Sequence, residues 1–118
     1  MYKALYLSPM IPSYNIAETA LFFKNVFEFN TALDSKDYMI LYKDNLTIHI
    51  LHAGKRIGQM EFYIEVDNID PLWDLIRHKI AEMKIPIREP FDRDYGMREF
   101  HIGIPHTKAL MFVGHAIK

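Results

Sequence analysis

Two segments of the chain carry apolar side chains at the spacing of an amphipathic helix. These apolar residues recur every three or four positions: Ile16, Ala20, Phe23 and Phe27 in the first segment, and Leu72, Leu75, Ile76, Ile80 and Met83 in the second. Asn15 and Asn68 stand just before them as N-cap residues, which accept hydrogen bonds from free backbone N–H groups. Glu18 completes a capping box in the first helix, and Pro71 suits the first turn of the second. The pattern predicts one helix in each half of the chain, with Trp73 packed rather than free for a ligand.

The other apolar segments alternate with polar residues at a period of two, which is typical of strands with one buried face. In one of them, Leu46, Ile48 and Ile50 fall on one face and His49 on the other. The predicted strands span residues 4–9, 29–33, 37–42 and 46–51 in the first half, and residues 60–66, 85–91, 97–102 and 108–113 in the second. Each half therefore has the order strand, helix and three strands.

The two halves are related by a weak internal repeat. The pairs Asn15-Ile16 and Asn68-Ile69 open the two helices at an offset of 53 residues. Between the halves lies the glycine-bracketed polar stretch Ala53–Gly58, which reads as a connector. We therefore expect a first module over residues 1–54 and a second over 55–118, which form one domain because neither half has enough apolar residues for its own core.

Composition and charge exclude several classes of function. Fourteen basic and fifteen acidic residues give a net charge of −1, so no positive field attracts nucleic acid or an anionic membrane. The chain has no cysteine, which excludes disulfides, thiolate metal sites and cysteine nucleophiles. It also lacks an apolar run near the roughly 20 residues that span a bilayer, and it lacks the sequence motifs of serine hydrolases, zinc proteases and nucleotide-binding loops. We expect a soluble cytoplasmic protein.

Three stretches carry a resemblance to a known family. They are Ala20–Phe29, which is similar to a helix signature with an aromatic pair, Tyr63–Asp70, and above all Tyr95–Phe100. The sequence resembles the vicinal oxygen chelate superfamily of glyoxalases, dioxygenases and bleomycin-resistance proteins, and in particular its bleomycin-resistance-like branch. The resemblance implies an α+β fold of two βαβββ modules, with curved mixed sheets and helices on their outer faces. It also implies a small-molecule ligand and a homodimer.

Two stretches depart from the family pattern. Glu28 replaces the glycine that usually ends the first helix in a left-handed conformation, so that Asn30 is an alternative for this role. The turn before the last strand reads Ile104–Lys108 rather than the family's Asp-Pro-Asp-Gly-Asn, which implies a different hairpin.

The metal-ligand positions of the family correspond here to Ser8, His49, Glu61 and Met111. Serine and thioether are poor ligands for zinc, manganese, nickel or ferrous iron, so only two of the four positions are competent. This set favours a metal-free binding protein with no cofactor and no catalytic residue. A second possibility is that Glu99 and His101 join His49 and Glu61 in a non-standard metal set.

Strand parity predicts which side chains share one cup. If the apolar residues of each strand face the helices, the remaining ones point inward: His49, Glu61, Tyr63, Glu99, His101 and Met111. We expect these residues to bind a planar or cationic small molecule at the module or dimer interface. One slipped residue sends a whole strand to the other face.

Three alternatives to simple binding remain open at this stage. The chain is a metal-dependent lyase, isomerase or dioxygenase, or an acid–base catalyst in which Glu61 and Glu99 share the cup and one pKa is raised, or a module that serves only in association. The remaining histidines are expected at the surface: His52, His78, His106 and His115. The short connector allows the two modules to pair within one chain or to be exchanged between chains.

Overall fold

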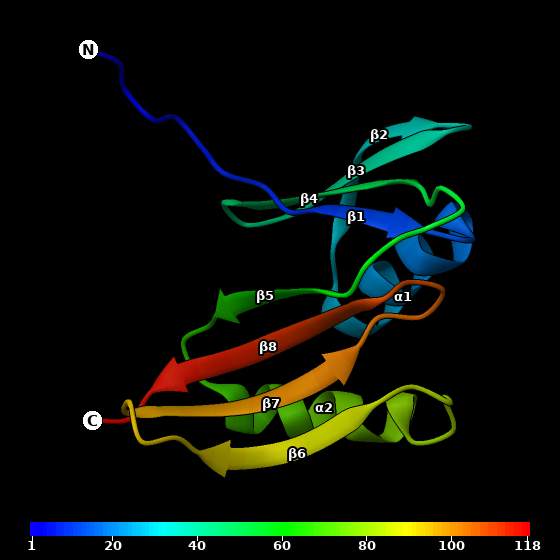
Figure 1. The fold of residues 1–118 in the computed structure, drawn as a ribbon. Coiled ribbons are helices and arrows are strands. Elements are labelled where there is room, and N and C mark those ends of the chain that lie inside the picture. The colour runs from blue at the N-terminus through cyan, green and yellow to red at the C-terminus, as the bar shows by residue number, and fades with distance from the viewer.

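A computed structural model describes all residues, 1–118, and contains two four-stranded sheets with one helix each (Figure 1). The elements are β1 Met10–Ser13, α1 Ile16–Phe27, β2 Asn30–Ser35, β3 Tyr38–Lys43, β4 Leu46–His52, β5 Met60–Glu65, α2 Ile69–Ile80, β6 Ile87–Asp92, β7 Met97–Gly103 and β8 Ala109–Ala116. The order strand, helix and three strands thus occurs twice, and the predicted α+β fold of two βαβββ modules is confirmed. Neither helix is long and apolar enough to cross a bilayer.

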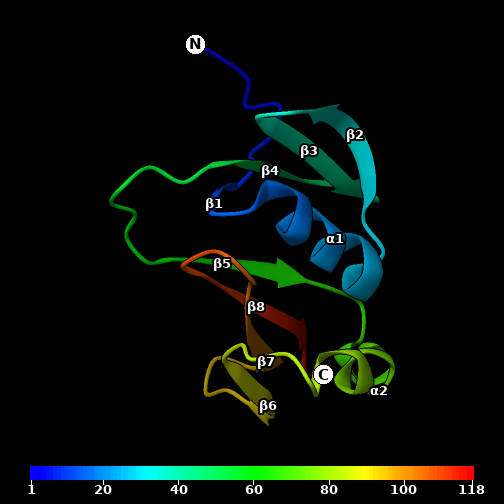
Figure 2. The same cartoon turned by 90° about the vertical axis from the view of Figure 1, so that its right-hand side faces the viewer.

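The two sheets have the same mixed topology. Their strand orders are β1-β4-β3-β2 and β5-β8-β7-β6, with the first pair of each sheet parallel and the others antiparallel. Figure 2 shows α1 beneath the first sheet and α2 beside the second, so each sheet has one covered face. We call the other face of each sheet its open face; the two open faces point in different directions.

One apolar core joins the two modules. It contains 21 buried residues from both helices and both sheets, with Phe23, Ile76 and Phe100 among the fully enclosed ones. Trp73 packs its ring 5.1 Å from that of Phe100, as the helical pattern predicts. Leu75 does not belong to the buried stripe, because half of its surface is exposed.

The strand predicted over residues 4–9 is wrong, because it does not overlap the first strand of the structure. Residues 1–9 form no strand, and the strand begins at Met10 and runs through Pro12. Proline is tolerated there because β1 is an edge strand, which pairs only with β4. Met10 rather than Ser8 therefore lies opposite His49 in the register. The preceding arm, residues 1–9, is bonded to β4 at Ser8 and Pro9, and its first residues extend away from the body of the molecule (Figure 1).

The end of α1 and the last hairpin differ from the family pattern in ways that the backbone explains. Glu28 itself adopts the left-handed conformation, with φ of 61°, so the alternative assignment of this role to Asn30 is wrong. The N–H groups of Glu28 and Phe29 both bond to the carbonyl of Phe23, which closes the helix. In the last hairpin His106 has a φ of 65°, and the Thr107 hydroxyl bonds the Ile104 carbonyl at 2.8 Å.

Candidate functional site

The open face of the second sheet carries its polar and aromatic side chains. Cross-strand partners lie on the same face of a sheet, and the register pairs Tyr63 with Phe112, His101 with Phe112, and Glu99 with both Phe91 and Gly114. Most alternate positions of β5, β7 and β8 are apolar and belong to the core on the side of α2, while Asp92, Arg98 and His115 lie at the end of that face. The residues of this open face include Glu61, Tyr63, Glu65, Arg88, Phe91, Glu99, His101, Leu110, Phe112 and Gly114.

Glu99 is fully buried at the centre of this face and accepts four hydrogen bonds. Tyr63 donates from its hydroxyl at 3.2 Å, and Tyr95 donates to the same carboxylate oxygen. The other oxygen lies 2.5 Å from His101 Nε2 and 3.4 Å from Arg93 Nη1. We call these five residues the Glu99 cluster. Its carboxylate charge is compensated by the guanidinium and satisfied by donors on both oxygens, as a buried charge requires.

The cluster shifts the titration of its members. Burial by itself raises the pKa of Glu99, but hydrogen bonds from Tyr95, His101 and Tyr63 outweigh burial and lower that pKa below its ordinary value. Burial raises the pKa of Tyr63 far above its usual range, and the charge of Glu99 beside it adds to this effect. The hydrogen bond to Glu99 is also the main reason why the pKa of Tyr95 is raised. At neutral pH the cluster thus holds an ionised carboxylate between neutral phenols.

Four aromatic rings form a row beside this carboxylate, each in contact with the next. The His101 and Phe112 rings are stacked, with centroids 3.8 Å apart and planes 17° apart. The Phe91 ring meets His101 edge-on at 5.3 Å, and Tyr63 lies 6.2 Å from Phe112. We call these four residues the aromatic floor. Because Glu99 holds the imidazole through Nε2, the orientation of the stacked pair is fixed before a ligand binds.

Gly114 makes room for the cluster. A Cβ atom at this position would collide with the hydroxyl of Tyr63, and it would lie 2.8 Å from the carbonyl oxygen of Arg98. Gly114 is the register partner of Glu99 on β8, so the absence of a side chain lets the phenol of Tyr63 reach the carboxylate. The glycine is therefore part of the site.

The open face of the first sheet carries a simpler network around His49. Tyr38 bonds His49 Nδ1, and Tyr6 from the arm lies 3.3 Å from Nε2. The network holds no carboxylate, and His49 is only half-buried. Its hydrogen bonds stay within the first module, as those of the Glu99 cluster stay within the second.

The structure brings together three of the six residues predicted for the cup. Tyr63, Glu99 and His101 meet in the Glu99 cluster, while His49 lies on the other open face and Glu61 makes no hydrogen bond or ion pair. No group of three or more histidine and acidic side chains is close enough to hold a metal ion. The non-standard set of His49, Glu61, Glu99 and His101 is therefore not assembled within one chain.

The placement of Met111 in the cup is wrong. Met111 is fully buried in the core, in register with Phe62 and Ile102, which face α2. Phe112 takes the open-face position instead. The sequence of β8 is apolar at consecutive positions, so alternation did not indicate which set faces the helix.

Sequence reasoning also missed Phe91, Arg93 and Tyr95 as partners of Glu99. Arg93 and Tyr95 belong to the turn between β6 and β7, where Gly96 has a φ of 81°. This turn folds Tyr95 back onto Glu99 four residues later. The only signal for them in the sequence is the stretch Tyr95–Phe100, which carries the family resemblance.

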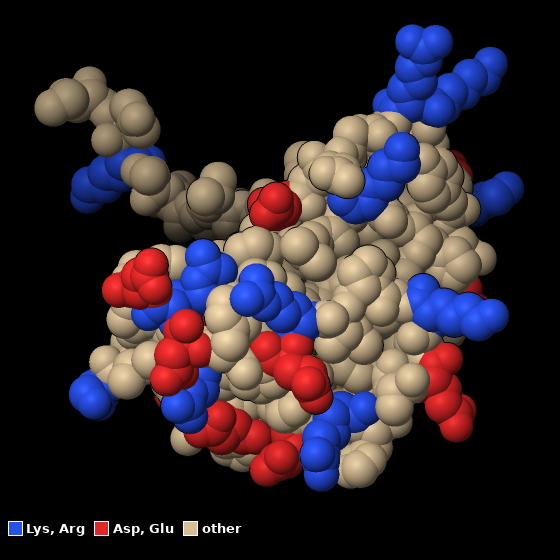
Figure 3. Space-filling model, turned by 60° about the horizontal axis from the view of Figure 1, so that its bottom comes forward, with Lys and Arg blue, Asp and Glu red and all other residues tan.

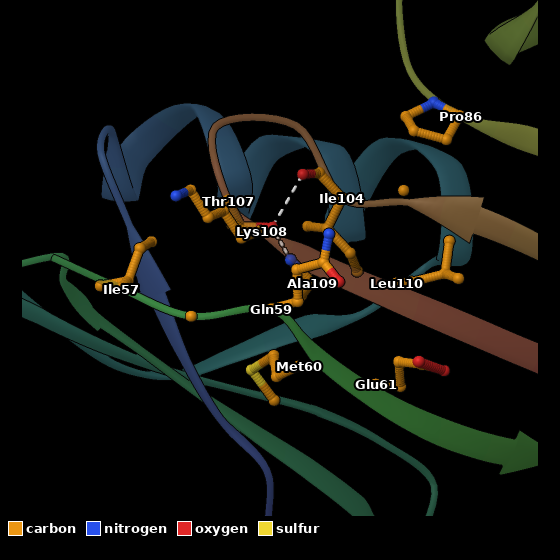
Figure 4. Close-up of a pocket in the computed structure, with 12 residues that line it drawn as sticks. Ile57, Gln59, Met60, Glu61, Pro86, Ile104, Thr107, Lys108, Ala109 and Leu110 are labelled. Atoms are coloured by element: carbon orange, nitrogen blue, oxygen red, sulfur yellow. Dashed lines mark hydrogen bonds between the residues drawn. The ribbon is translucent and has the colours of Figure 1, made fainter.

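A hollow of about 640 Å³ lies at one end of the second sheet (Figure 4). The connector, the start of β5 and the last hairpin form it, and its lining includes Ile57, Glu61, Pro86, Thr107 and Lys108. The Thr107 hydroxyl is already engaged by the Ile104 carbonyl and the Ala109 N–H. Glu61 stands at the border between this hollow and the open face, so the hollow extends the surface that a ligand on the open face can reach.

Charged side chains near this sheet are of both signs. Figure 3 shows acidic and basic groups interspersed on this side of the molecule, without a broad area of one sign. This distribution agrees with the net charge of −1 and offers no continuous basic track for a phosphate backbone.

Several solved structures share the fold of this chain. No protein-family model and no curated protein sequence matches the chain. Among solved structures, the bleomycin resistance determinant encoded on transposon Tn5 superposes with a TM-score of 0.80 at 14% identity, over 96% of this chain and 98% of that one. A bleomycin-binding protein from Streptomyces verticillus, in complex with copper(II)-bleomycin, has a TM-score of 0.78 at 17% identity, over 100% and 99%. Lactoylglutathione lyase from Agrobacterium tumefaciens has a TM-score of 0.74 at 13% identity, over 96% and 94%.

These likenesses confirm the fold that the sequence resemblance implies. The matched proteins include two that bind or resist an antibiotic and one lyase, so the fold hosts both binding and catalysis. The choice between these functions rests on the open faces of this chain.

Proposed function

From the fold shared with bleomycin-binding and glyoxalase-like proteins, we propose that this protein sequesters a planar aromatic small molecule on the aromatic floor of the second sheet. The observation that carries the proposal is the stacked pair His101 and Phe112, held in one orientation by the buried carboxylate of Glu99. A planar ligand that packs against these rings gains dispersion and stacking energy, about 0.5–1.5 kcal/mol per aromatic pair beyond its area burial. Binding costs little free energy of side-chain reorganisation, because Glu99 already orients the imidazole in the free protein.

The state of Glu99 supports binding rather than proton transfer. A general base needs a carboxylate whose pKa is raised toward neutrality and whose oxygen is free to accept a proton. Here hydrogen bonds lower the pKa of Glu99, and all four donors point at its two oxygens. Glu61 does not contact it. The hypothesis that Glu61 and Glu99 share a cup in which one pKa is raised is therefore wrong.

We propose further that a second copy of the chain completes the site. The open faces of one chain point in different directions (Figure 2), so the floor lacks a lid within its own chain. The arm exposes Leu5 and Leu7 almost completely. Their apolar surface is unfavourable in water, and packing on a second copy would bury it. In a two-fold dimer, the first sheet of one copy would cover the second sheet of the other, with an interface above roughly 2,000 Å².

Light scattering at micromolar concentration tests the assembly. We expect a dimer, and we expect the double substitution Leu5→Ser and Leu7→Ser to weaken it. Leu75→Ser, which changes an exposed leucine on α2, serves as the matched control and should leave the dimer intact. A monomeric wild-type protein at this concentration would contradict the proposed dimer and leave the aromatic floor uncovered.

Ligand titrations test the binding site itself. The single tryptophan, Trp73, packs on Phe100 directly behind the floor, so its fluorescence offers a readout for titration with copper(II)-bleomycin and with planar naphthyl compounds. We expect Phe112→Leu to weaken the tightest of these ligands by about tenfold, which corresponds to about 1.4 kcal/mol. Leu75→Ala should have no effect. Equal affinities for the wild-type protein and Phe112→Leu would place the site elsewhere.

A further inference from the structure

The charges on the open face of the second sheet are ordered by strand. Glu61 and Glu65 lie on β5, which forms one edge of the sheet, and neither makes an ion pair. Arg88 lies on β6, which forms the opposite edge, and it is the register partner of His101. Between these edges the carboxylate of Glu99 is compensated by Arg93. On this face, unpaired carboxylates therefore lie on β5 and an unpaired guanidinium lies on β6.

Arg88 is held in place without using its hydrogen bonds. Its guanidinium carbon lies 3.7 Å from the centre of the Phe91 ring, while the guanidinium of Arg93 lies 5.2 Å from the same ring. Arg88 has no carboxylate, carbonyl or hydroxyl partner in the structure, whereas Arg93 and Arg98 both have acidic partners. A guanidinium stacked on a ring keeps its in-plane N–H donors free, in the geometry that binds a carboxylate through two parallel hydrogen bonds.

On this basis we propose that the sequestered ligand carries an anionic group, a carboxylate or a sulfonate, that Arg88 binds at the β6 edge while the aromatic part lies on the floor. The inference rests on the proposed function and adds the charge of the ligand to it. It reverses the expectation of a cationic ligand. Glu99, the central acid of the cup, stays ionised, but its charge is already paired with Arg93 and satisfied by its hydrogen-bond donors. Arg88 is an unpaired charge directly across from His101 in the register.

Three naphthyl probes of the same shape test this inference by calorimetric titration of the full chain. They are 2-naphthoate, the neutral 2-naphthamide and the cationic 2-naphthylmethylammonium. We expect 2-naphthoate to bind about fivefold more tightly than 2-naphthamide at low ionic strength, with the advantage falling as salt screens the exposed guanidinium. We expect the ammonium probe to bind no more tightly than the amide.

Substitutions assign the preference to one side chain. Arg88→Ala should reduce the ratio between naphthoate and naphthamide affinities to about one, and Arg88→Lys should restore part of it, because it keeps the charge but not the planar pair of donors. Arg77→Ala removes an exposed arginine from α2 and should change neither affinity.

The possible outcomes separate the two proposals. Equal binding of all three probes, tighter binding of the ammonium probe, or an unchanged preference in Arg88→Ala would overturn the anionic assignment and leave the aromatic site intact. A failure of all three probes to bind would overturn the aromatic site and the anionic assignment with it.

Discussion

The two open faces show how one topology, used twice, carries two different networks. On the first sheet His49 lies between the hydroxyls of Tyr38 and Tyr6, with no charged partner. On the second sheet the corresponding role is taken by a buried carboxylate, Glu99, which holds His101. Both faces thus present a histidine ring beside tyrosine hydroxyls, but only the second contains a charge removed from water.

The difference has an energetic consequence. A half-buried imidazole that loses one neutral hydrogen bond finds water in its place, so little stability is lost. A buried carboxylate that loses its partners has no substitute, and removing the carboxylate charge leaves the guanidinium and phenols that were arranged around it unsatisfied. The second open face should therefore be the stiffer and more sensitive of the two.

Replacing the central carboxylate should give the largest effect. We expect Glu99→Gln to lower the free energy of unfolding by on the order of 3 kcal/mol, because an amide places N–H groups against donors and leaves Arg93 unpaired. Urea denaturation measures this change. Glu65→Gln, on the same face but without a partner, should change stability by less than about 0.5 kcal/mol. Similar values for the two variants would show that Glu99 is not a structural charge.

The same carboxylate should make stability depend on acid pH. The pKa of Glu99 is lower in the folded protein than in the unfolded chain, where it is about 4.3, so the unfolded state takes up the proton first as pH falls. Its contribution is present above about pH 4.3 and is lost as pH falls through the folded pKa. Glu99→Gln should flatten this part of the stability profile measured by urea denaturation between pH 7 and pH 3. A profile of unchanged slope would contradict the assignment.

A methyl group at Gly114 should have the next largest effect. We expect Gly114→Ala to cost roughly 2 kcal/mol, because the new Cβ displaces the Tyr63 hydroxyl and crowds a backbone carbonyl. Thermal unfolding of this variant, of Tyr63→Phe and of the double variant forms a cycle in which the loss of the hydroxyl relieves part of the strain. Gly58→Ala is the control, since nothing lies within 4 Å of its Cβ position. Strict additivity in the cycle would contradict this contact.

The first open face should respond less. We expect Tyr38→Phe to lower stability by about 0.5–1 kcal/mol, the value of one partly buried neutral hydrogen bond to His49. Chemical denaturation against the wild-type protein gives the number. A loss as large as that of Glu99→Gln would mean that the two networks are equivalent after all.

The smallest effect is expected at the arm. Tyr6 is mostly exposed, and its hydroxyl reaches His49 at 3.3 Å, so Tyr6→Phe should change the stability of the fold by no more than a few tenths of a kcal/mol. Denaturation at the lowest usable protein concentration limits the contribution of any dimer. A clear loss under these conditions would show that the arm belongs to the folded body.

Local patterns were enough to predict the elements of this fold. Caps and apolar spacing located both helices within a few residues, and alternation located seven of the eight strands. The first strand was the exception, because Pro12 reads as a strand breaker, and only its position at the sheet edge explains why it is tolerated. Parity also placed Tyr63, Glu99 and His101 on one face, since their strands alternate clearly between apolar and polar residues.

The composition of the site depended on contacts that no local pattern encodes. Met111 and Phe112 are both apolar, so the hydrophobic effect gives no preference between two registers until Phe62 and Ile102 are packed beside them. The turn at Gly96 brings Tyr95 to Glu99, and the pairing of that carboxylate with Arg93 is the reason why we propose an anionic rather than a cationic ligand. Burial and pairing are properties of the folded chain, because they depend on which distant groups exclude water from each charge.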